Sequence, residues 1–264
     1  SFASTEDHGR PVDLIYAGLM ASGLFMDVLD TRVLVYDGAT GTWLQGRDLT
    51  ADDFGGPALE GCNEILVQTR PELIGEMHRD YLAAGADVIE TNTFGAFGVP
   101  LAEYGLETQT FSINETAARI ARDAANDFST SDKPRFVAGS IGPGTKFATL
   151  GHISYVDLRD LYAEQARGLI AGGVDLFIIE TQFDLLGAKA AMNGCRIAMR
   201  EAGLDLPLQV QVTIETTGRM LPGTEISAAL VALDAMKPQI IGINCATGPV
   251  EMSEHVRHLY QHSR

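Results

Sequence analysis

The fold is decided by the stretch Gln239-Ile240-Ile241-Gly242-Ile243-Asn244-Cys245-Ala246-Thr247-Gly248-Pro249, an apolar run that stops at a polar pair and a turn. A short apolar run bounded by glycine and proline is typical of a strand buried on both faces, the pattern of parallel sheets. Cys245 then lies at the carboxyl end of that strand, where loops of α/β folds assemble binding sites. The alternative interpretation is a buried cysteine that packs as a small hydrophobe.

The same sequence of strand and polar loop recurs along the chain. Further strands are predicted at residues 33–36, 86–89, 135–140, 174–179 and 208–214. Helical patterns lie between them. The helix at 71–82 is expected to begin after Thr69 as its N-cap and to end at Gly85, and the helix at 158–171 to end at Gly172-Gly173. This alternation predicts right-handed crossovers and a parallel sheet.

Polar residues follow every predicted strand, namely Asp37, Glu90, Ser140, Glu180, Glu215 and Cys245. A ring of such strand ends favours a (β/α)8 TIM-type barrel over a doubly wound sheet, which binds ligands mainly at one switch point. The chain holds about six βα units, so we expect a barrel that is truncated after the sixth. Residues 26–264 are the predicted barrel domain, and residues 1–25 are a predicted N-terminal leader or extra helix.

Composition excludes several classes of protein. With 19 basic and 35 acidic residues, the formal net charge of -16 repels nucleic acid and anionic lipid. The apolar segment 14–25 is shorter than the roughly 20 residues that a membrane helix needs, and acidic residues precede it where a secretory signal has basic ones. Three scattered cysteines do not form a disulfide framework, so we expect a reducing, cytoplasmic setting.

Several loops resemble the homocysteine S-methyltransferase family. The resemblance begins with Asp-Gly-Ala-Thr-Gly-Thr at 37–42, Gly-Cys-Asn-Glu-Ile-Leu at 61–66 with Thr-Arg-Pro-Glu at 69–72, and the segment 84–94. It continues in order through 139–144, 179–184 and 242–249, and so spans Val33 to about the C-terminus. It is closest to the homocysteine-binding domain of the cobalamin-dependent members. One departure is Thr40, where methionine is common.

The resemblance implies a barrel methyltransferase that holds zinc through three cysteine thiolates, with the substrate's sulfur as the fourth ligand. Cys245 matches the first of these ligands and is the predicted catalytic residue. The adjacent cysteine pair that supplies the other two is absent, and Cys62 and Cys195 are interpreted as packing residues. Zinc would deprotonate the incoming thiol, whose ordinary pKa is about 8.5, and so prepare it to attack a methyl group.

The resemblance also implies a substrate, homocysteine, and the groups that hold its charged ends. Asp37 and Glu180 are the expected acceptors for the ammonium group. The backbone N–H groups of the Gly38-Ala39 turn and the hydroxyls of Thr91 and Thr93 suit the carboxylate. Taken without the resemblance, an Asp-Gly pair is equally compatible with turn chemistry, and a glutamate at a strand end with a helix cap.

The remaining predictions concern the metal and the methyl donor. Asn244 is expected to orient the metal ligand Cys245. The implied donor is methylcobalamin, recharged from methyltetrahydrofolate, with both bound by downstream modules that are not in this chain. The alternatives are a stand-alone enzyme that uses a small sulfonium or ammonium donor, or a truncated binding module that is inactive alone. His255, His258 and His262 share one helical face, which could hold a metal or be a solvated surface.

Overall fold

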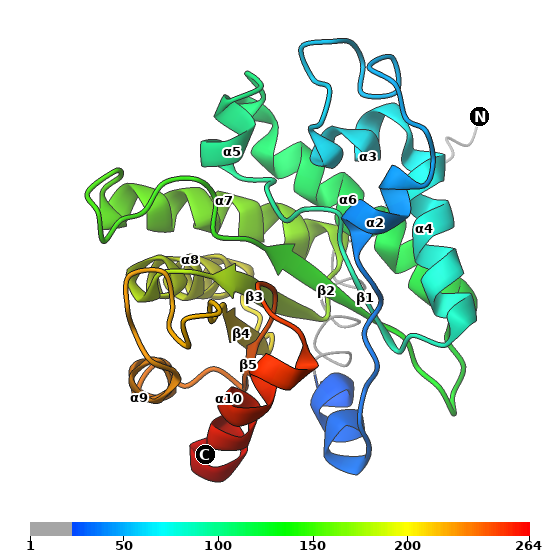
Figure 1. Ribbon diagram of the computed structural model, residues 1–264. Helices are drawn as coiled ribbons and strands as arrows, with labels where there is room; N and C mark the ends of the chain where they lie inside the picture. Colours follow the sequence, from blue (N-terminus) through cyan, green and yellow to red (C-terminus); the bar gives the residue numbers. More distant parts are fainter. Residues whose placement is uncertain (1–22) are drawn as a thin grey trace, which may run out of the picture.

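The computed structural model describes residues 23–264 and shows one curved parallel sheet with helices on its outer side (Figure 1). Its five strands pair in chain order, and every pair is parallel. They are β1 (Val88–Glu90), β2 (Phe136–Ile141), β3 (Leu176–Gln182), β4 (Leu208–Val212) and β5 (Ile240–Ile243). The predicted α/β class and parallel sheet are confirmed.

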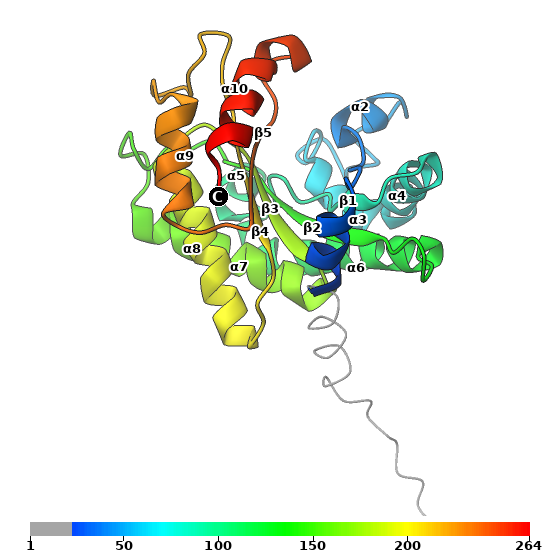
Figure 2. The same ribbon diagram turned by 90° about the horizontal axis from the view of Figure 1, so that it is seen from below.

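A helix follows each strand, and the longest three lie side by side along the sheet (Figures 1 and 2). The helices are α2 (Thr40–Gln45), α3 (Leu66–Thr69), α4 (Pro71–Ala84), α5 (Gly98–Ala102), α6 (Thr110–Phe128), α7 (Tyr155–Gly172), α8 (Leu185–Ala202), α9 (Ile226–Asp234) and α10 (Pro249–His262), with 3-10 turns η1 (Asn63–Ile65) and η2 (Glu107–Gln109). Residues 23–31 form a further helix. Glycines allow α6, α7 and α8 to approach closely. A Cβ added to Gly194 would lie 2.7 Å from the Arg159 carbonyl oxygen.

The segment 33–36, predicted as a strand, forms only a single parallel bridge, between Tyr36 and Val88. Its pairing is continued by backbone hydrogen bonds, because Val35 O accepts from Asp87 N at 2.7 Å. Val33 and Val35 are 82% and 57% exposed, so the segment is not buried on both faces as its apolar sequence had suggested. The prediction of a full strand at 33–36 was therefore wrong, although the segment does lie beside β1.

The helix ends test the cap predictions. Gly85 and Gly173 close α4 and α7 in left-handed conformations, with φ values of 115° and 91°, as predicted. Thr69 does not cap α4, however. Helix α3 continues through Thr69, whose hydroxyl donates to the Ile65 carbonyl at 3.3 Å, and Arg70 occupies the N-cap position without a side-chain bond.

The concave face of the sheet has its own apolar cluster at the amino ends of the strands. Phe25, from the helix 23–31, is fully buried there and meets the Phe136 ring edge-on at 5.3 Å. Higher on this face the Tyr36 hydroxyl donates to Gln209 Oε1 of β4 at 2.6 Å, which links the first segment of the sheet to the fourth strand. The curvature of the sheet brings these two segments together.

The domain boundary predicted between residues 25 and 26 falls inside the helix 23–31, and residues 1–22 lie outside the described part of the chain. The strands β1 and β5 are the outer strands of the five-stranded sheet and are not paired with each other in residues 23–264. Closure into an eight-stranded barrel stays a prediction.

Candidate functional site

Alternation along three neighbouring strands places polar side chains on the concave face. In β1, β2 and β3 the odd-numbered residues Ile89, Val137 and Phe177 pack under the outer helices, whereas even-numbered residues face inward. Because side chains alternate between the two faces of a strand, Glu90, Ser140 and Glu180 follow the inner apolar residues on the same side. The carboxyl ends of the strands therefore gather these groups above the apolar cluster.

A cavity of about 340 Å³ opens at this end of the sheet. Its lining comes from six segments and contains no lysine or arginine: Gly38, Ala39, Thr40, Gly41, Asn63, Glu64, Glu90, Thr91, Asn92, Thr93, Phe94, Ser140, Glu180 and Cys245. The structure thus brings together at one cavity most of the residues predicted as a site. Glu215 is not among them, since it lies in a turn where its N–H donates to the Arg219 carbonyl.

Glu180 is the best-anchored carboxylate of the cavity. Ser140 Oγ donates to its Oε1 at 2.6 Å and Asn244 Nδ2 donates to its Oε2 at 3.2 Å. Burial raises the pKa of Glu180, although these hydrogen bonds oppose the rise. Burial also raises the pKa of Glu90 well above its ordinary value, and the charges of Glu180 and Asp37 add to that effect. The cavity therefore favours a ligand that brings positive charge.

Asp37 lies behind the cavity wall and does not line it. Its Oδ2 accepts the Glu90 N–H at 2.9 Å, which fixes the carboxyl end of β1. Burial raises the pKa of Asp37 to about 7, with a contribution from the charge of Glu180, against the hydrogen bonds that it accepts. Asp37 can therefore contribute to the binding of a cation through the electrostatic effect of its charge.

Cys245 follows β5 in an uncommon backbone conformation. Its φ is 62°, that of Ala246 is 60°, and that of the neighbouring Thr181 is 56°, all in the left-handed region that non-glycine residues rarely adopt. Such positions cost of order 1 kcal/mol each and cluster at functional sites. The Cys245 thiol is exposed and lies 3.4 Å from the Thr181 hydroxyl. Cys245 lines the cavity, and the two loops that meet at its thiol both contain a residue in this conformation.

Asn244 connects Cys245 to Glu180. Its Oδ1 accepts the Thr181 N–H at 2.8 Å, which fixes the amide, and its Nδ2 lies 2.9 Å from Thr181 Oγ1 and 3.4 Å from Cys245 Sγ. The same Nδ2 reaches Glu180. A single side chain can therefore orient both the thiol and the carboxylate, which is the kind of role predicted for it.

The hydroxyl hydrogens of Thr91 and Thr93 are already engaged in hydrogen bonds within the protein. Thr93 Oγ1 donates to the Ser140 carbonyl at 2.7 Å, so the contact of 2.6 Å between Thr91 Oγ1 and Thr93 Oγ1 requires Thr91 as donor. Thr91 Oγ1 in turn accepts the Ser140 N–H at 3.0 Å. These bonds tie β1 to β2, and a ligand carboxylate would have to displace one of them to gain a hydroxyl donor.

The Gly38-Ala39 turn is held from behind by Tyr81 of α4. The tyrosine hydroxyl donates to the Ala39 carbonyl at 3.2 Å, and a Cβ added to Gly38 would lie 2.7 Å from the ring. A larger residue at 38 would require the Tyr81 ring to move. The turn lines the cavity, as the predicted carboxylate role requires, and its backbone is held in place.

The residues present do not build the implied zinc site. Cys245 is the only cysteine that lines the cavity, because Cys62 and Cys195 are buried elsewhere, as expected of packing residues. Across residues 23–264 no group of three or more histidine, cysteine or acidic side chains is arranged to hold a metal ion. Of the histidine row on α10, His258 and His262 lie with ring centroids 4.5 Å apart and ring planes inclined by 44°. The described chain thus offers one of the three predicted thiolates.

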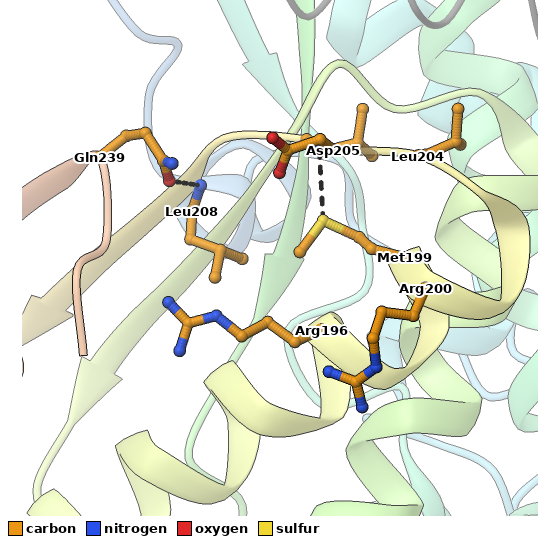
Figure 3. A pocket seen from close by; sticks show the side chains of 8 residues that line it. Arg196, Met199, Arg200, Leu204, Asp205, Leu208 and Gln239 are labelled. Carbon is orange, nitrogen blue, oxygen red and sulfur yellow. Dashed lines mark hydrogen bonds between the residues drawn. The ribbon is translucent and has the colours of Figure 1, made fainter.

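A second cavity, of about 290 Å³, lies at the amino ends of β4 and β5 (Figure 3). The guanidinium of Arg196, which lines it, donates to the Met236 and Lys237 carbonyls and so joins α8 to the segment before β5. Gln239 Oε1 accepts the Leu208 N–H at 2.8 Å. In barrel-like folds the amino ends of the strands serve stability, and these contacts agree with that role.

Comparison with known proteins decides the family. The model of the homocysteine S-methyltransferase family matches residues 34–264. The chain belongs to the homocysteine S-methyltransferase family. It is 51% identical over 239 residues to the methionine synthases of Mycobacterium tuberculosis (strain ATCC 25618 / H37Rv) and Mycobacterium leprae (strain TN). Each alignment covers 90% of this chain and 20% of the relative, so the chain spans about a fifth of those proteins. The family predicted from the loops is confirmed.

Solved structures of this family share the fold. The metallated form of the homocysteine methyltransferase MmuM from Escherichia coli superposes with a TM-score of 0.71 at 22% identity, covering 89% of this chain and 82% of that one. Its apo form gives 0.67 at 23% identity, covering 88% and 80%. At this level of identity the likeness concerns the fold alone. Among the helices of residues 23–264, none is long and apolar enough to cross a membrane.

Some cavity residues are not among those that the sequence predicts as a binding site. Asp37 is a predicted ammonium acceptor and Glu90 only a strand end, yet Glu90 lines the cavity and Asp37 supports it from behind. Ser140 is likewise predicted only as a strand end, and Glu64 only as part of a family motif. The alternation of side chains along β1, β2 and β3 is the signal that could have identified Glu90 and Ser140, because it places both residues on the same face of the sheet as Glu180.

Proposed function

We propose that this chain is the homocysteine-binding domain of a methionine synthase, which presents homocysteine for methylation to methionine. The observation that carries the proposal is the meeting of Glu90, Glu180 and Cys245 in one cavity that has no cationic lining residue. Membership in the homocysteine S-methyltransferase family and the 51% identity to methionine synthases support it.

The cavity matches the two ends of homocysteine. Its buried carboxyl groups favour the ammonium group, because a cation relieves the repulsion between them. Glu180, fixed by Ser140 and Asn244, is the direct acceptor in this proposal. The sulfur end would then point to Cys245 at the exposed side of the cavity, where a methyl donor can reach it. Asp37 acts from behind, and the Gly38-Ala39 turn supplies backbone donors for the carboxylate.

The proposal also includes zinc and the methyl donor, for which this chain supplies only part of the binding groups. Cys245 is proposed as one zinc ligand, and bound zinc would lower the pKa of the substrate thiol. Residues 23–264 do not provide a complete metal site by themselves. Methylcobalamin and methyltetrahydrofolate are proposed to be bound by other modules of the parent protein. The alignment supports this, because the chain spans about a fifth of the methionine synthase that it matches.

Homocysteine binding tests the proposal. We expect Glu180→Gln to weaken the affinity by roughly tenfold or more, because a charged partner of a buried ammonium group is lost. Glu215→Gln, outside the cavity, is the matched control and should stay within about twofold. Isothermal titration calorimetry measures both. Equal affinities of the two variants, or no binding by the unaltered chain, would contradict the proposal.

The zinc assignment has a separate test in metal content per chain after equilibration with zinc and homocysteine, measured on the full-length parent protein because residues 23–264 offer one of the three thiolates. We expect Cys245→Ala to lower the zinc content and His258→Ala to leave it unchanged. Zinc that depends on His258 instead would transfer the site to the histidine row of α10.

A further inference from the structure

Glu64 is a half-buried glutamate whose carboxyl group the proposed function does not use. It lies on η1, between the buried Cys62 and Ile65, and it lines the cavity. Burial raises its pKa, with the hydrogen bonds that it accepts acting in the opposite direction. Burying a carboxyl group is costly unless its oxygens find donors, so the contacts of Glu64 indicate what it is for.

This carboxyl group has one contact that is local in sequence, with Cys62, and a shorter one that holds the loop after β1, 31 residues away. Its Oε1 accepts the Gly95 N–H at 2.8 Å, while Cys62 Sγ lies 3.8 Å from Oε2. A Cβ added to Gly95 would lie 2.8 Å from the same Oε1, so the loop approaches the carboxyl group closely. A second bond runs in the same direction, from Asn92 Nδ2 of the loop to the Asn63 carbonyl at 2.7 Å. Two hydrogen bonds thus join η1 to the loop 91–97.

This loop forms a large part of the cavity wall, through residues 91–94. Its other side is tied down by bonds from the core, since Gly142 N donates to the Phe94 carbonyl at 2.9 Å and Gln165 Nε2 to the Thr93 carbonyl at 2.8 Å. Those bonds hold carbonyl groups on the side of β2 and α7. On the η1 side, Glu64 holds the Gly95 N–H group, next to the residues 91–94 that form the cavity wall.

We propose that Glu64 is a positioning residue that fixes the 91–95 loop through the Gly95 N–H and so shapes the cavity wall for homocysteine. The proposal rests on the proposed function for the identity of the ligand. An acceptor oxygen at Oε1 is all that the role requires. The amide of a glutamine offers the same oxygen, whereas an alanine offers none.

The experiment compares Glu64→Ala, Glu64→Gln and the control Glu60→Ala, an exposed glutamate of the same segment. Two quantities are measured on each: homocysteine affinity by calorimetry, and amide hydrogen exchange of the 91–97 segment without ligand. We expect Glu64→Ala to weaken binding roughly tenfold to hundredfold and to speed exchange at Gly95. Glu64→Gln should restore both to within about threefold, and Glu60→Ala should change neither.

Each other outcome overturns the assignment. Binding by Glu64→Ala within threefold of the unaltered chain would show that the bond does not shape the cavity. A loss in Glu64→Gln as large as in Glu64→Ala would show that the charge, and not the acceptor oxygen, is what matters. Should Glu64→Ala fail to fold, Asn92→Ala cuts the second bond between the same segments. It should weaken binding while Glu64→Gln does not, and unchanged binding would overturn the proposal.

The two proposals fail in different ways. If the unaltered chain does not bind homocysteine, the proposed function fails, while the exchange of the Gly95 amide still tests Glu64. If the unaltered chain binds and the Glu64 variants all bind equally, only the positioning role fails.

Discussion

At the scale of single residues, the carboxyl cluster of Asp37, Glu90 and Glu180 makes ligand binding depend on pH. A pKa raised in the folded state means that folding favours the protonated form, so its stabilising contribution is present below the ordinary pKa and is lost as pH rises through the folded value. For Asp37 that window runs from about 4 to about 7. A bound ammonium group has the opposite effect, because it stabilises the ionised carboxylate and not the protonated form.

We therefore expect homocysteine affinity to increase as pH rises from 6 to 8, with release of a proton on binding. Calorimetry at several pH values and in two buffers of different ionisation enthalpy measures both effects. Asp37→Asn should flatten the pH dependence. An affinity that is constant or falls over this range would rule out the cluster as the ammonium site.

The candidate site could be predicted from sequence as far as its chemistry, but not in its arrangement. Cys245, Glu180 and the Gly38-Ala39 turn could be identified because each follows a predicted strand, and those strand ends do meet at one cavity. The hydrogen bonds that occupy the hydroxyls of Thr91 and Thr93 run to the backbone of β2, some 47 and 49 residues away. No local pattern reveals which hydrogens remain free for a ligand.

At the scale of elements, the packing of α7 against α8 depends on a glycine. We expect Gly194→Ala to destabilise the fold by roughly 1–3 kcal/mol, because the new Cβ would lie 2.7 Å from the Arg159 carbonyl and 2.8 Å from the Ala163 nitrogen. The cost of this steric contact exceeds the stabilisation of about 1 kcal/mol that replacing glycine by alanine gives in a helix interior. Urea denaturation measures the difference.

Gly187→Ala in the same helix is the matched control. Its new Cβ would meet nothing closer than 3.7 Å, so the variant should be neutral or stabilised by up to about 1 kcal/mol. Equal effects of the two substitutions would mean that helix propensity, and not the contact with α7, governs position 194.

The elements show where pattern reasoning works and where it fails. The strands from β1 to β5 could be predicted because buried parallel strands have continuous apolar runs. The segment 33–36 has such a run as well, but its pairing is fixed by Arg32, which donates two hydrogen bonds to the Asp87 carboxylate at 2.8 and 2.9 Å. Thr69 was a plausible cap by residue type, but α3 extends through it, and short helices that adjoin another helix carry little periodic signal.

At the scale of the whole molecule, the helix 23–31 stabilises the sheet from its concave side. We expect Phe25→Ala to cost about 3–5 kcal/mol of unfolding free energy, since the ring is fully buried against Phe136. Leu24→Ala, at a side chain that is 43% exposed, is the control and should cost less than about 1 kcal/mol. Denaturation curves that shift equally for both would show that this helix does not anchor the sheet.

The order of the strands has a consequence for how the chain acquires its structure. Each strand pairs with the one before it in sequence, so each new βα unit can dock on its predecessor while later residues are still being synthesised. The contact between Tyr36 and Gln209 is different, because 173 residues separate the two side chains. It can form only after β4 has emerged from the ribosome, so this link across the concave face is made later in synthesis than the pairing of β1, β2 and β3.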